Sequence, residues 1–392
     1  MLYILLPNVH INIFSFLNLH TDTISPDTII SNSLSHYLYE IKNKITTYGR
    51  DWDTYKKYTN PYEYINSIVP NKSKCVSKYK PLSRSYFKMI EIITAFDLCT
   101  FDKINSFHLA EGPGGFIEAL ANTRNNLSDN YVGMTLLDDV NDCNIPAWKK
   151  SDIFLRNNPN VRIENGKTGT GDILSIENFD YCLSKYGSSM DIITADGGFD
   201  FSSDFNNQEN NIVKLLFGQV CYAICMQKQG GHFVLKIFDC FMEHTVDILY
   251  ILSAFYKSVY ITKPNTSRYA NSEKYVVCKN FMFSSNSAFV PTLRKCLNLT
   301  IDSTTYIHRF LKCPISNYYI SKIEEYNAIV GQQQIEHIQQ TIILIENKHK
   351  NDKIDNLIRV NTQKCSNWCV SHDIQYNVFT NHFLDGSHSN FG

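Results

Sequence analysis

The chain has 392 residues, of which 43% are apolar and 19% are charged. This composition is typical of a soluble globular protein with a substantial core, and it excludes an intrinsically disordered chain. The 37 basic and 38 acidic residues give a net charge of −1, which excludes a positive field over the whole molecule, so nucleic-acid binding would need local patches.

The first eighty residues mix short apolar runs with Asn, Ser, Thr and Lys, and we expect them to form an N-terminal extension, residues 1–80. The apolar start, Met1 to Leu19, is interrupted by polar residues, and the first Lys or Arg is Lys42. This pattern predicts neither a signal peptide nor a membrane span. The twelve cysteines lack the spacing of a secreted disulfide framework, so we expect reduced thiols in a cytosol-like compartment.

A run of basic residues without an acid follows, from Asn71 to Lys88. Its members are Lys72, Lys74, Lys78, Lys80, Arg84 and Lys88. Such a run is either a solvated face or a patch that contacts nucleic acid.

Residues 81–283 alternate between strand-like and helical segments. The expected strands are Ser106–Ala110, Asn130–Thr135, Met190–Ala195, Gly231–Ile237, Ser258–Thr262 and Lys274–Cys278, and the clearest helices are Phe116–Asn122 and Asn211–Lys228. Alternation of this kind predicts an α/β domain with a mostly parallel sheet. Ligands of such sheets bind at the carboxyl ends of the strands, so the residues that follow strands are the candidates for function.

A glycine-rich turn follows the first of these strands. It reads Ala110-Glu111-Gly112-Pro113-Gly114-Gly115-Phe116 and leads into a helix. Glycines allow the backbone to approach a ligand closely, although a tight turn without a ligand would look similar. The spacing differs from the dinucleotide fingerprint, which argues against such a cofactor.

Three charged residues accompany the later strands. Asp196 ends an apolar strand and precedes two glycines, Lys236 lies inside an apolar strand, and Glu273 comes directly before another. A lysine among apolar neighbours is costly unless it is paired or functional. An aspartate at a strand end could also simply cap the next turn.

The remaining residues, 284–392, are more polar and are expected to be helical with a frayed tail, as in the run Ile335–Asn347. Cys365, Cys369 and His372 raise the alternative of a structural zinc site, but a second matching pair of ligands is missing.

Lys88, Asp196, Lys236 and Glu273 together suit one kind of chemistry, the methylation of a ribose 2′-hydroxyl. This hydroxyl is a poor nucleophile, and a lysine can take its proton or stabilise the alkoxide. A second lysine and a carboxylate can hold the first lysine in place, and an aspartate favours the positive charge of a sulfonium methyl donor. Such a displacement needs positioning and no metal.

The chain resembles the FtsJ-like 2′-O-methyltransferases, and most closely the cap-specific mRNA (nucleoside-2′-O-)methyltransferases. The matching segments, in order, are Ser83–Met89, Gly112–Phe116, Gly133–Leu136, Gly171–Ile173, Ala195–Phe199, Lys236–Asp239 and Thr266–Lys279. The resemblance implies a Rossmann-like class I S-adenosylmethionine-dependent methyltransferase fold, with N- and C-terminal extensions around a domain at residues 81–283.

The resemblance also implies roles for individual residues. It makes Lys236 the activating lysine and completes a tetrad with Lys88, Asp196 and Glu273. The residues implied to bind S-adenosylmethionine are Ala110, Glu111, Gly112, Pro113, Gly114, Gly115, Phe116, Asp138, Asp172 and Ile173. The residues implied to bind the cap or RNA are Lys42, Lys56, Asn207, Gln208 and Asn271. In two places the chain departs from the family pattern: Glu111 replaces a small residue, and Lys56 replaces an arginine.

We therefore expect methylation of the first transcribed nucleotide of capped mRNA, with capped mRNA as partner and other capping or transcription components as further candidates. The alternatives are a ribosomal or transfer RNA 2′-O-methyltransferase and an inactive RNA-binding subunit. Guanine N7 methylation fits poorly, since that ring nitrogen needs no activating lysine. The Asn-, Ile- and Lys-rich composition indicates an AT-rich genome, and large cytoplasmic DNA viruses encode enzymes of this kind. A viral origin, with location in the host cytoplasm or virion, therefore stands beside a cellular origin, for which the nucleus is the alternative.

Overall fold

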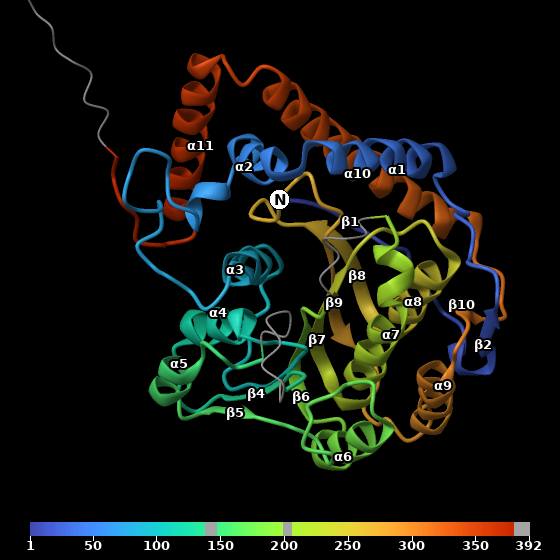
Figure 1. The fold of residues 1–392 in the computed structure, drawn as a ribbon. Helices are drawn as coiled ribbons and strands as arrows, with labels where there is room; N and C mark the ends of the chain where they lie inside the picture. The colour runs from blue at the N-terminus through green and yellow to red at the C-terminus, as the bar shows by residue number, and fades with distance from the viewer. Residues whose placement is uncertain (138–146, 199–205, 380–392) are drawn as a thin grey trace, which may run out of the picture.

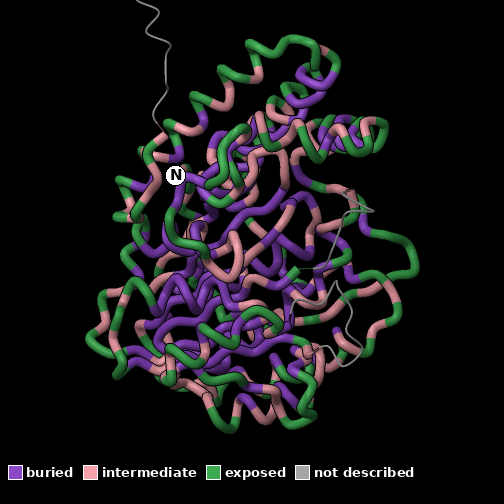
Figure 2. The backbone as a smooth tube through the Cα atoms, turned by 60° about the vertical axis from the view of Figure 1, so that its left-hand side comes forward, coloured by how far each residue is buried: buried purple, intermediate pink, exposed green. Residues whose placement is uncertain are grey.

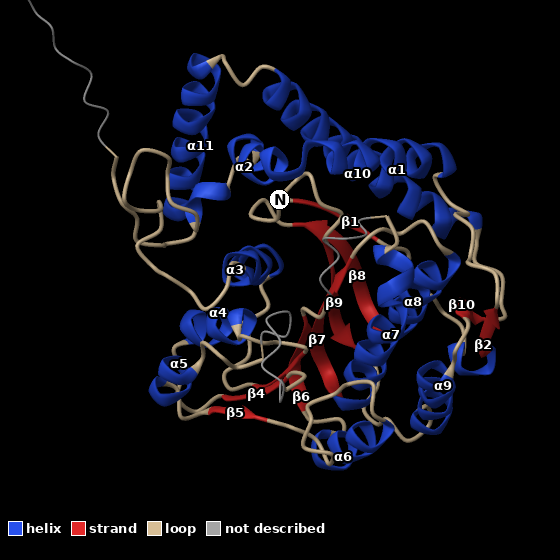
Figure 3. Ribbon diagram, in the orientation of Figure 1, coloured by secondary structure: helices blue, strands red, loops and turns tan. Residues whose placement is uncertain are grey.

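The structure is a computed structural model that describes residues 1–137, 147–198 and 206–379. In these residues the central sheet has eight strands in the order β1-β8-β9-β7-β6-β3-β4-β5 (Figures 1 and 3). The strands are β1 (Leu2–Leu5), β3 (Asn105–Leu109), β4 (Asn130–Met134), β5 (Val161–Ile163), β6 (Met190–Ala195), β7 (Gln227–Ile237), β8 (Tyr256–Lys263) and β9 (Lys274–Phe281). Strands β7, β6, β3, β4 and β5 are parallel, and β9, β8 and β1 continue the sheet in antiparallel pairing. The predicted mostly parallel α/β sheet is confirmed.

The strands in the middle of the sheet are covered on both faces, which explains their nearly continuous apolar sequence. All six residues of β6 are buried. The six predicted strands are present with ends shifted by up to four residues, and β1 and β5 were not predicted. Because β1 has four residues and β5 three, neither is long enough to show a clear hydrophobic period.

Helices cover both faces of the sheet (Figure 1). One face carries α3 (Ser85–Phe96), α4 (Gly115–Arg124) and α5 (Asp152–Asn157), and the other carries α6 (Ile176–Tyr186), α7 (Gln208–Met226) and α8 (Glu243–Phe255). Helix α7 is buried almost all round because it packs against the sheet as well as α6, α8 and α9 (Val290–Asp302). Figure 2 shows the buried segments gathered inside and the exposed turns at the rim.

The N- and C-terminal regions pack against each other above one edge of the sheet. They contribute α1 (Asn32–Ile45), α2 (Gly49–Thr59), α10 (Asn317–Glu346) and α11 (Asn351–Ser371), together with the short helices η1 (Ile13–Phe16), η2 (Thr46–Tyr48) and η3 (Glu63–Ile65). Helix α10 lies across α1 and α2 (Figure 1). The C-terminal region is not entirely helical, since its strand β10 (Tyr306–Leu311) pairs with β2 (Leu17–Asp22).

None of the helices within the described ranges has the length and apolar content needed to cross a membrane. The eleven cysteines of the described part are free thiols. The Sγ of Cys365 donates to the carbonyl oxygen of Pro61, and the ring of His372 stacks on Trp368. Across residues 1–137, 147–198 and 206–379 we find no group of three His, Cys, Asp or Glu side chains that could hold a metal, so the zinc alternative lacks a ligand set.

Candidate active site

Adjacent elements bring the four tetrad residues together. Lys88 lies on α3, Asp196 follows β6, Lys236 lies on β7, and Glu273 immediately precedes β9. Strand β7 pairs with β6 on one side and with β9 on the other. Tyr275 of β9 can therefore reach Asp196, 79 positions earlier in the sequence, across β7. Helix α3 packs on one face of the sheet and brings Lys88 into contact with Glu273.

The tetrad forms two charge pairs. The Nζ atom of Lys236 donates to the backbone oxygen of Asp196 at 2.6 Å and lies 3.4 Å from its Oδ1. The Nζ atom of Lys88 lies 2.7 Å from Oε1 and 2.8 Å from Oε2 of Glu273. The hydroxyl of Tyr275 donates to Oδ1 of Asp196 at 3.0 Å and fixes that carboxylate. All four side chains are between 11% and 16% exposed, which keeps their charges poorly screened.

Electrostatics keeps Glu273 ionised. Burial alone would raise its pKa, but the charges of Lys88, Lys236 and Lys263 outweigh burial and lower the pKa to about 2. The carboxylate therefore neutralises part of the local positive charge over the whole physiological range.

Lys263, at the end of β8, holds the C-terminal part of the loop 264–273 through hydrogen bonds. Its buried Nζ donates to the backbone oxygens of Asn271 and Glu273 at 2.7 and 2.8 Å, and to Oδ1 of Asn271 at 3.0 Å. Burial lowers the pKa of Lys263 to about 7. It was not predicted as a site residue, although it begins the loop and, like Lys236, lies in an apolar strand.

Buried carboxylates hold the other end of the same loop. Glu91 accepts hydrogen bonds from the backbone N–H groups of Asn265 and Thr266, 2.8 and 2.7 Å. Glu63 bridges Arg84 and Arg268, with closest distances of 2.7 and 2.8 Å. Burial would raise the pKa of Glu63, but hydrogen bonding to Arg268 and the two arginine charges bring it far below its usual range.

Neither carboxylate was predicted, because the partners lie up to 205 positions away in the sequence. A weak signal exists for Glu63, which stands within the segment Asn60-Pro61-Tyr62-Glu63.

The glycine-rich turn closes the opposite side of the site. Ala110 adopts a positive φ of 51°, a conformation that non-glycine residues adopt mainly at constrained positions. An added Cβ at Gly115 would collide with the hydroxyls of Ser83 and Ser85, so the glycine allows the start of α4 to lie close to the start of α3.

Glu111, the departure noted in the sequence, has a structural explanation. Its Oε1 accepts hydrogen bonds from the N–H groups of Phe116 and Ile117, 2.6 and 3.1 Å, at the start of α4. The carboxylate therefore caps the helix from inside the turn. The ring of Phe116 is also buried and packs against Tyr275. The side chains of Glu111 and Phe116 therefore stabilise the turn.

The other predicted cofactor residues lie at neighbouring strand ends. Oδ1 of Asp172 accepts a hydrogen bond from the N–H of Leu174 at 2.8 Å within its loop. The N–H of Leu137 donates to the backbone oxygen of Thr170 at 2.9 Å and holds the loop beside the end of β4. The side chain of Ile173 is buried in the core, which leaves its backbone for any ligand contact. Asp138 lies outside the described residues.

The turn has the features expected of a cradle for S-adenosylmethionine. Three buried polar atoms around it have no partner among the described residues: Oε2 of Glu111, Nε1 of Trp148 and Oε1 of Gln219. The side chain of Trp148 lies close to Gly133 and that of Gln219 lies close to Gly197, because a Cβ added at either glycine would touch it. Both polar groups therefore lie beside the strand ends. Unpartnered polar groups beside glycines fit a polar ligand.

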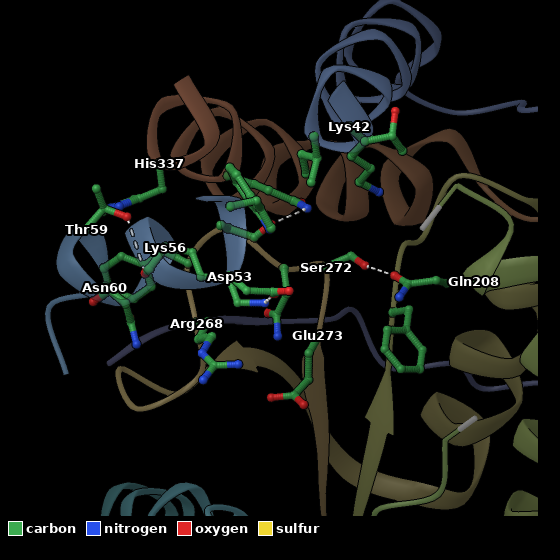
Figure 4. Close-up of a pocket in the computed structure, with 18 of the residues that line it drawn as sticks. Lys42, Asp53, Lys56, Thr59, Asn60, Gln208, Arg268, Ser272, Glu273 and His337 are labelled. Atoms are coloured by element: carbon green, nitrogen blue, oxygen red, sulfur yellow. Dashed lines mark hydrogen bonds and ion pairs between the residues drawn. The ribbon is translucent and has the colours of Figure 1, made fainter. Parts of the chain in front are cut away.

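A cavity of about 730 Å³ lies between the ends of strands β6, β7 and β9 and helices α1, α2 and α10 (Figure 4). Lys236, Gly198 and Glu273 line it, so the cavity reaches the tetrad. Its described lining includes five cations and two acids: Lys42, Arg50, Lys56, Lys236, Arg268, Asp53 and Glu273. Four of these five cations are paired with carboxylates, so the lining offers an anionic ligand N–H donors rather than unbalanced charge.

The predicted cap-binding lysines both line the cavity, and both are ion-paired. Lys42 is 6% exposed and lies 2.9 Å from Oδ2 of Asp239. Lys56 lies 2.6 Å from Oδ1 of Asp53 on the same helix. Lys42 thus also ties α1 to the segment that follows β7.

Two of the predicted RNA residues line the cavity as well. Oε1 of Gln208 accepts a hydrogen bond from the hydroxyl of Ser272, and Asn271 is held by Lys263. Asn207 is exposed at the start of α7 and is not part of this lining.

Residues 81–281, just over half of the chain, match the model of the FtsJ-like methyltransferases. The chain belongs to this family. The family assignment confirms the resemblance and the methyltransferase fold, and S-adenosylmethionine is its methyl donor. The residues of the glycine-rich turn would hold it, in keeping with the unpartnered polar groups there.

Three curated proteins illustrate the relationship. Cap-specific mRNA (nucleoside-2′-O-)-methyltransferase 2 of Drosophila melanogaster is 27% identical over 268 residues, covering 63% of this chain and 36% of that protein. The protein of the same name from Pongo abelii is 29% identical over 355 residues, 83% of this chain and 43% of that protein. Cap-specific mRNA (nucleoside-2′-O-)-methyltransferase 1 of Leishmania braziliensis is 30% identical over 241 residues, 59% of this chain and 58% of that protein. The chain thus spans less than half of the first two relatives.

Proposed function

We propose that this chain transfers a methyl group from S-adenosylmethionine to the ribose 2′-hydroxyl of the first transcribed nucleotide of capped mRNA, converting cap 0 to cap 1. The observation that carries the proposal is the position of Lys236. Its ammonium group lies between the glycine-rich cofactor side and a cation-rich cavity, within reach of Asp196 and beside the Lys88–Glu273 pair.

In the proposed reaction, S-adenosylmethionine supplies an electrophilic methyl group on a positively charged sulfur. The ammonium group of Lys236 binds the 2′-oxygen and stabilises the negative charge that develops on it, the hydroxyl proton leaves to solvent, and the donor sulfur keeps the electron pair of the broken methyl–sulfur bond. Asp196 orients Lys236 through the 2.6 Å hydrogen bond to its backbone oxygen. Glu273 offsets the charge of Lys88, which reduces the electrostatic repulsion between Lys88 and Lys236.

The cavity supports a capped 5′ end as the substrate. A cap carries a triphosphate bridge, and Arg50, Lys56 and Arg268 line the cavity close to Trp52 and Tyr269. Cations that face phosphates, together with aromatic side chains beside a base, are a common arrangement for binding the end of an RNA strand. The names of the curated relatives point to the same substrate class.

The direct test is methylation of matched RNAs with a labelled methyl donor. We expect rapid labelling of cap 0 RNA, on the 2′-oxygen of the first nucleotide, and little labelling of the same RNA with an uncapped 5′ end. Equal labelling of uncapped RNA would favour a ribosomal or transfer RNA enzyme. Label on the second nucleotide or on guanine N7 would contradict the cap 1 assignment.

The role of Lys236 has its own test. We expect Lys236→Ala to lower the rate of methyl transfer by about 10²–10⁴-fold, because the cation that stabilises the negative charge on the 2′-oxygen is lost. S-adenosylmethionine binding should be unchanged. Lys228→Ala is the matched control, since Lys228 lies on the same strand but is exposed and paired with Asp191. Calorimetry measures cofactor binding, and a Lys236→Ala protein with normal turnover would refute the assigned role.

A further inference from the structure

Part of the cavity wall comes from the C-terminal region, outside the segment that matches the family. Gln334 and His337 of α10 line the cavity together with Trp52 and Asn60, and Figure 4 shows His337 beside Thr59. The family match ends at residue 281, so it does not account for these two side chains.

Helix α10 is fixed in this position by an apolar cluster of its own. The cluster consists of Ile41, Ile45, Trp52, Ile338, Ile342 and Ile345, which come from α1, α2 and α10. Burying each such side chain is worth about 1.5–3 kcal/mol, so α10 cannot leave the cavity without a large loss of stability. The wall is therefore a permanent part of the described structure.

Helix α10 also touches the loop that carries Asn271 and Glu273. The Nε2 atom of Gln334, which is 1% exposed, donates to the backbone oxygen of Ala270 at 3.3 Å. The ring of His337 packs edge-on against Tyr269, with 4.8 Å between ring centroids. Two consecutive loop residues are thus braced by α10.

Helix α11 holds the other end of the same wall. The Nδ2 atom of Asn361 donates to the backbone oxygens of Tyr58 and Asn60, at 2.8 and 3.4 Å. Oδ1 of Asn60 is buried and has no partner among the described residues, although Asn60 lines the cavity. The end of the cavity near α10 therefore offers amide groups and three ring systems, Trp52, Tyr269 and His337.

We propose that α10 and α11 form a substrate-recognition element, and that His337 is a specificity-determining residue that contacts the base of the 5′-terminal nucleotide bound in the cavity. Rings and amides suit a purine base, whereas the phosphates would face Arg50 and Lys56 of α2. This inference rests on the proposed function, because it takes the cavity as the site of the capped end.

The test compares His337→Ala, His337→Phe and the control Gln339→Ala, which changes an exposed residue of the same helix. We expect His337→Ala to raise the KM for capped RNA and the Kd for a cap dinucleotide about tenfold, with kcat and S-adenosylmethionine affinity unchanged. His337→Phe keeps the packing on Tyr269 but lacks the ring nitrogens, so it should behave as His337→Ala. Quenching of tryptophan fluorescence reports dinucleotide binding, since Trp52 lines the cavity.

Wild-type KM and Kd in His337→Ala, or full recovery of both in His337→Phe, would overturn the contact with the base. A fall in thermal stability and cofactor affinity that accompanies the KM change would also overturn it, because the role would then be structural. If the wild-type protein methylates uncapped RNA equally well, the proposed cap specificity fails, and the inference about α10 is then judged on the KM for the accepted RNA.

Discussion

The Lys88–Glu273 pair allows the electrostatics of the site to be tested by protein stability. Its two side chains are 13% and 11% exposed and make contacts of 2.7 and 2.8 Å. Lys88, Lys236 and Lys263 together bring the pKa of Glu273 from the usual 4.5 to about 2, against the effect of burial. One pKa unit corresponds to about 1.4 kcal/mol, so the folded state favours the ionised carboxylate by roughly 3 kcal/mol.

Removing one partner leaves buried cations without a counter-charge, and we expect Glu273→Gln to lower the free energy of unfolding by about 3 kcal/mol. Lys88→Met should also destabilise the protein. In the double variant the second substitution should lower the free energy of unfolding by about 2 kcal/mol less than it does alone, since the first substitution has already removed the Lys88–Glu273 ion pair. Urea denaturation of all four proteins at neutral pH measures the free energies.

Additive effects, within about 0.5 kcal/mol, would show that the two side chains do not interact and would refute this account of the site. The pH dependence gives a second check. The stabilisation from a lowered carboxyl pKa is fully present above the usual value of 4.5 and is lost as the pH falls towards about 2. The stability difference between wild type and Glu273→Gln should therefore narrow on acidification below 4.5.

Two further predictions concern residues that support the site. Lys263→Met should lower kcat about tenfold with unchanged cofactor affinity, because two backbone oxygens, of Asn271 and Glu273, and the side-chain Oδ1 of Asn271 each lose a hydrogen bond; an unchanged kcat would contradict this. Since the pKa of Lys263 is lowered to about 7, wild-type stability should gain over that of the variant as the pH rises from 7 towards the usual 10.5. Gly171→Ala should weaken S-adenosylmethionine binding about tenfold, because Gly171 has a φ of 69° and its added Cβ would collide with the backbone oxygen of Thr135; calorimetry showing normal affinity would refute it.

Local patterns were sufficient for the interior of the sheet. Strand β6 was predicted with the bounds that the structure has, because its apolar run ends abruptly at Asp196-Gly197-Gly198. The same reasoning placed Asp196 at the carboxyl end of a strand, where the ligands of parallel sheets bind, whereas Lys236 was singled out because it lies inside an apolar strand. Strand β1 was not predicted, because its four residues are stabilised by pairing with β8 rather than by their own hydrophobic period.

The roles of several polar residues could not be read from the sequence. Glu111 looked like a departure within a cofactor turn, and the structure makes it a cap for α4. Lys42 was expected to meet the cap, yet its charge is paired with Asp239, 197 positions away. The sequence around a charged residue is the same whether its side chain faces a ligand or a buried partner, so only the tertiary structure distinguishes the two.

The sequence by itself determined the interior strands, the helices between them and the glycine-rich turn, and it singled out Lys88, Asp196, Lys236 and Glu273 as the predicted tetrad. These depend on the hydrophobic period and on backbone constraints that act over a few residues. The tertiary structure decided which distant segments meet: Lys88 with Glu273, Glu63 with Arg84 and Arg268, and the C-terminal α10 with the cavity. Such pairings are set by packing and by charge compensation across 21 to 205 positions of sequence, and no local pattern records them.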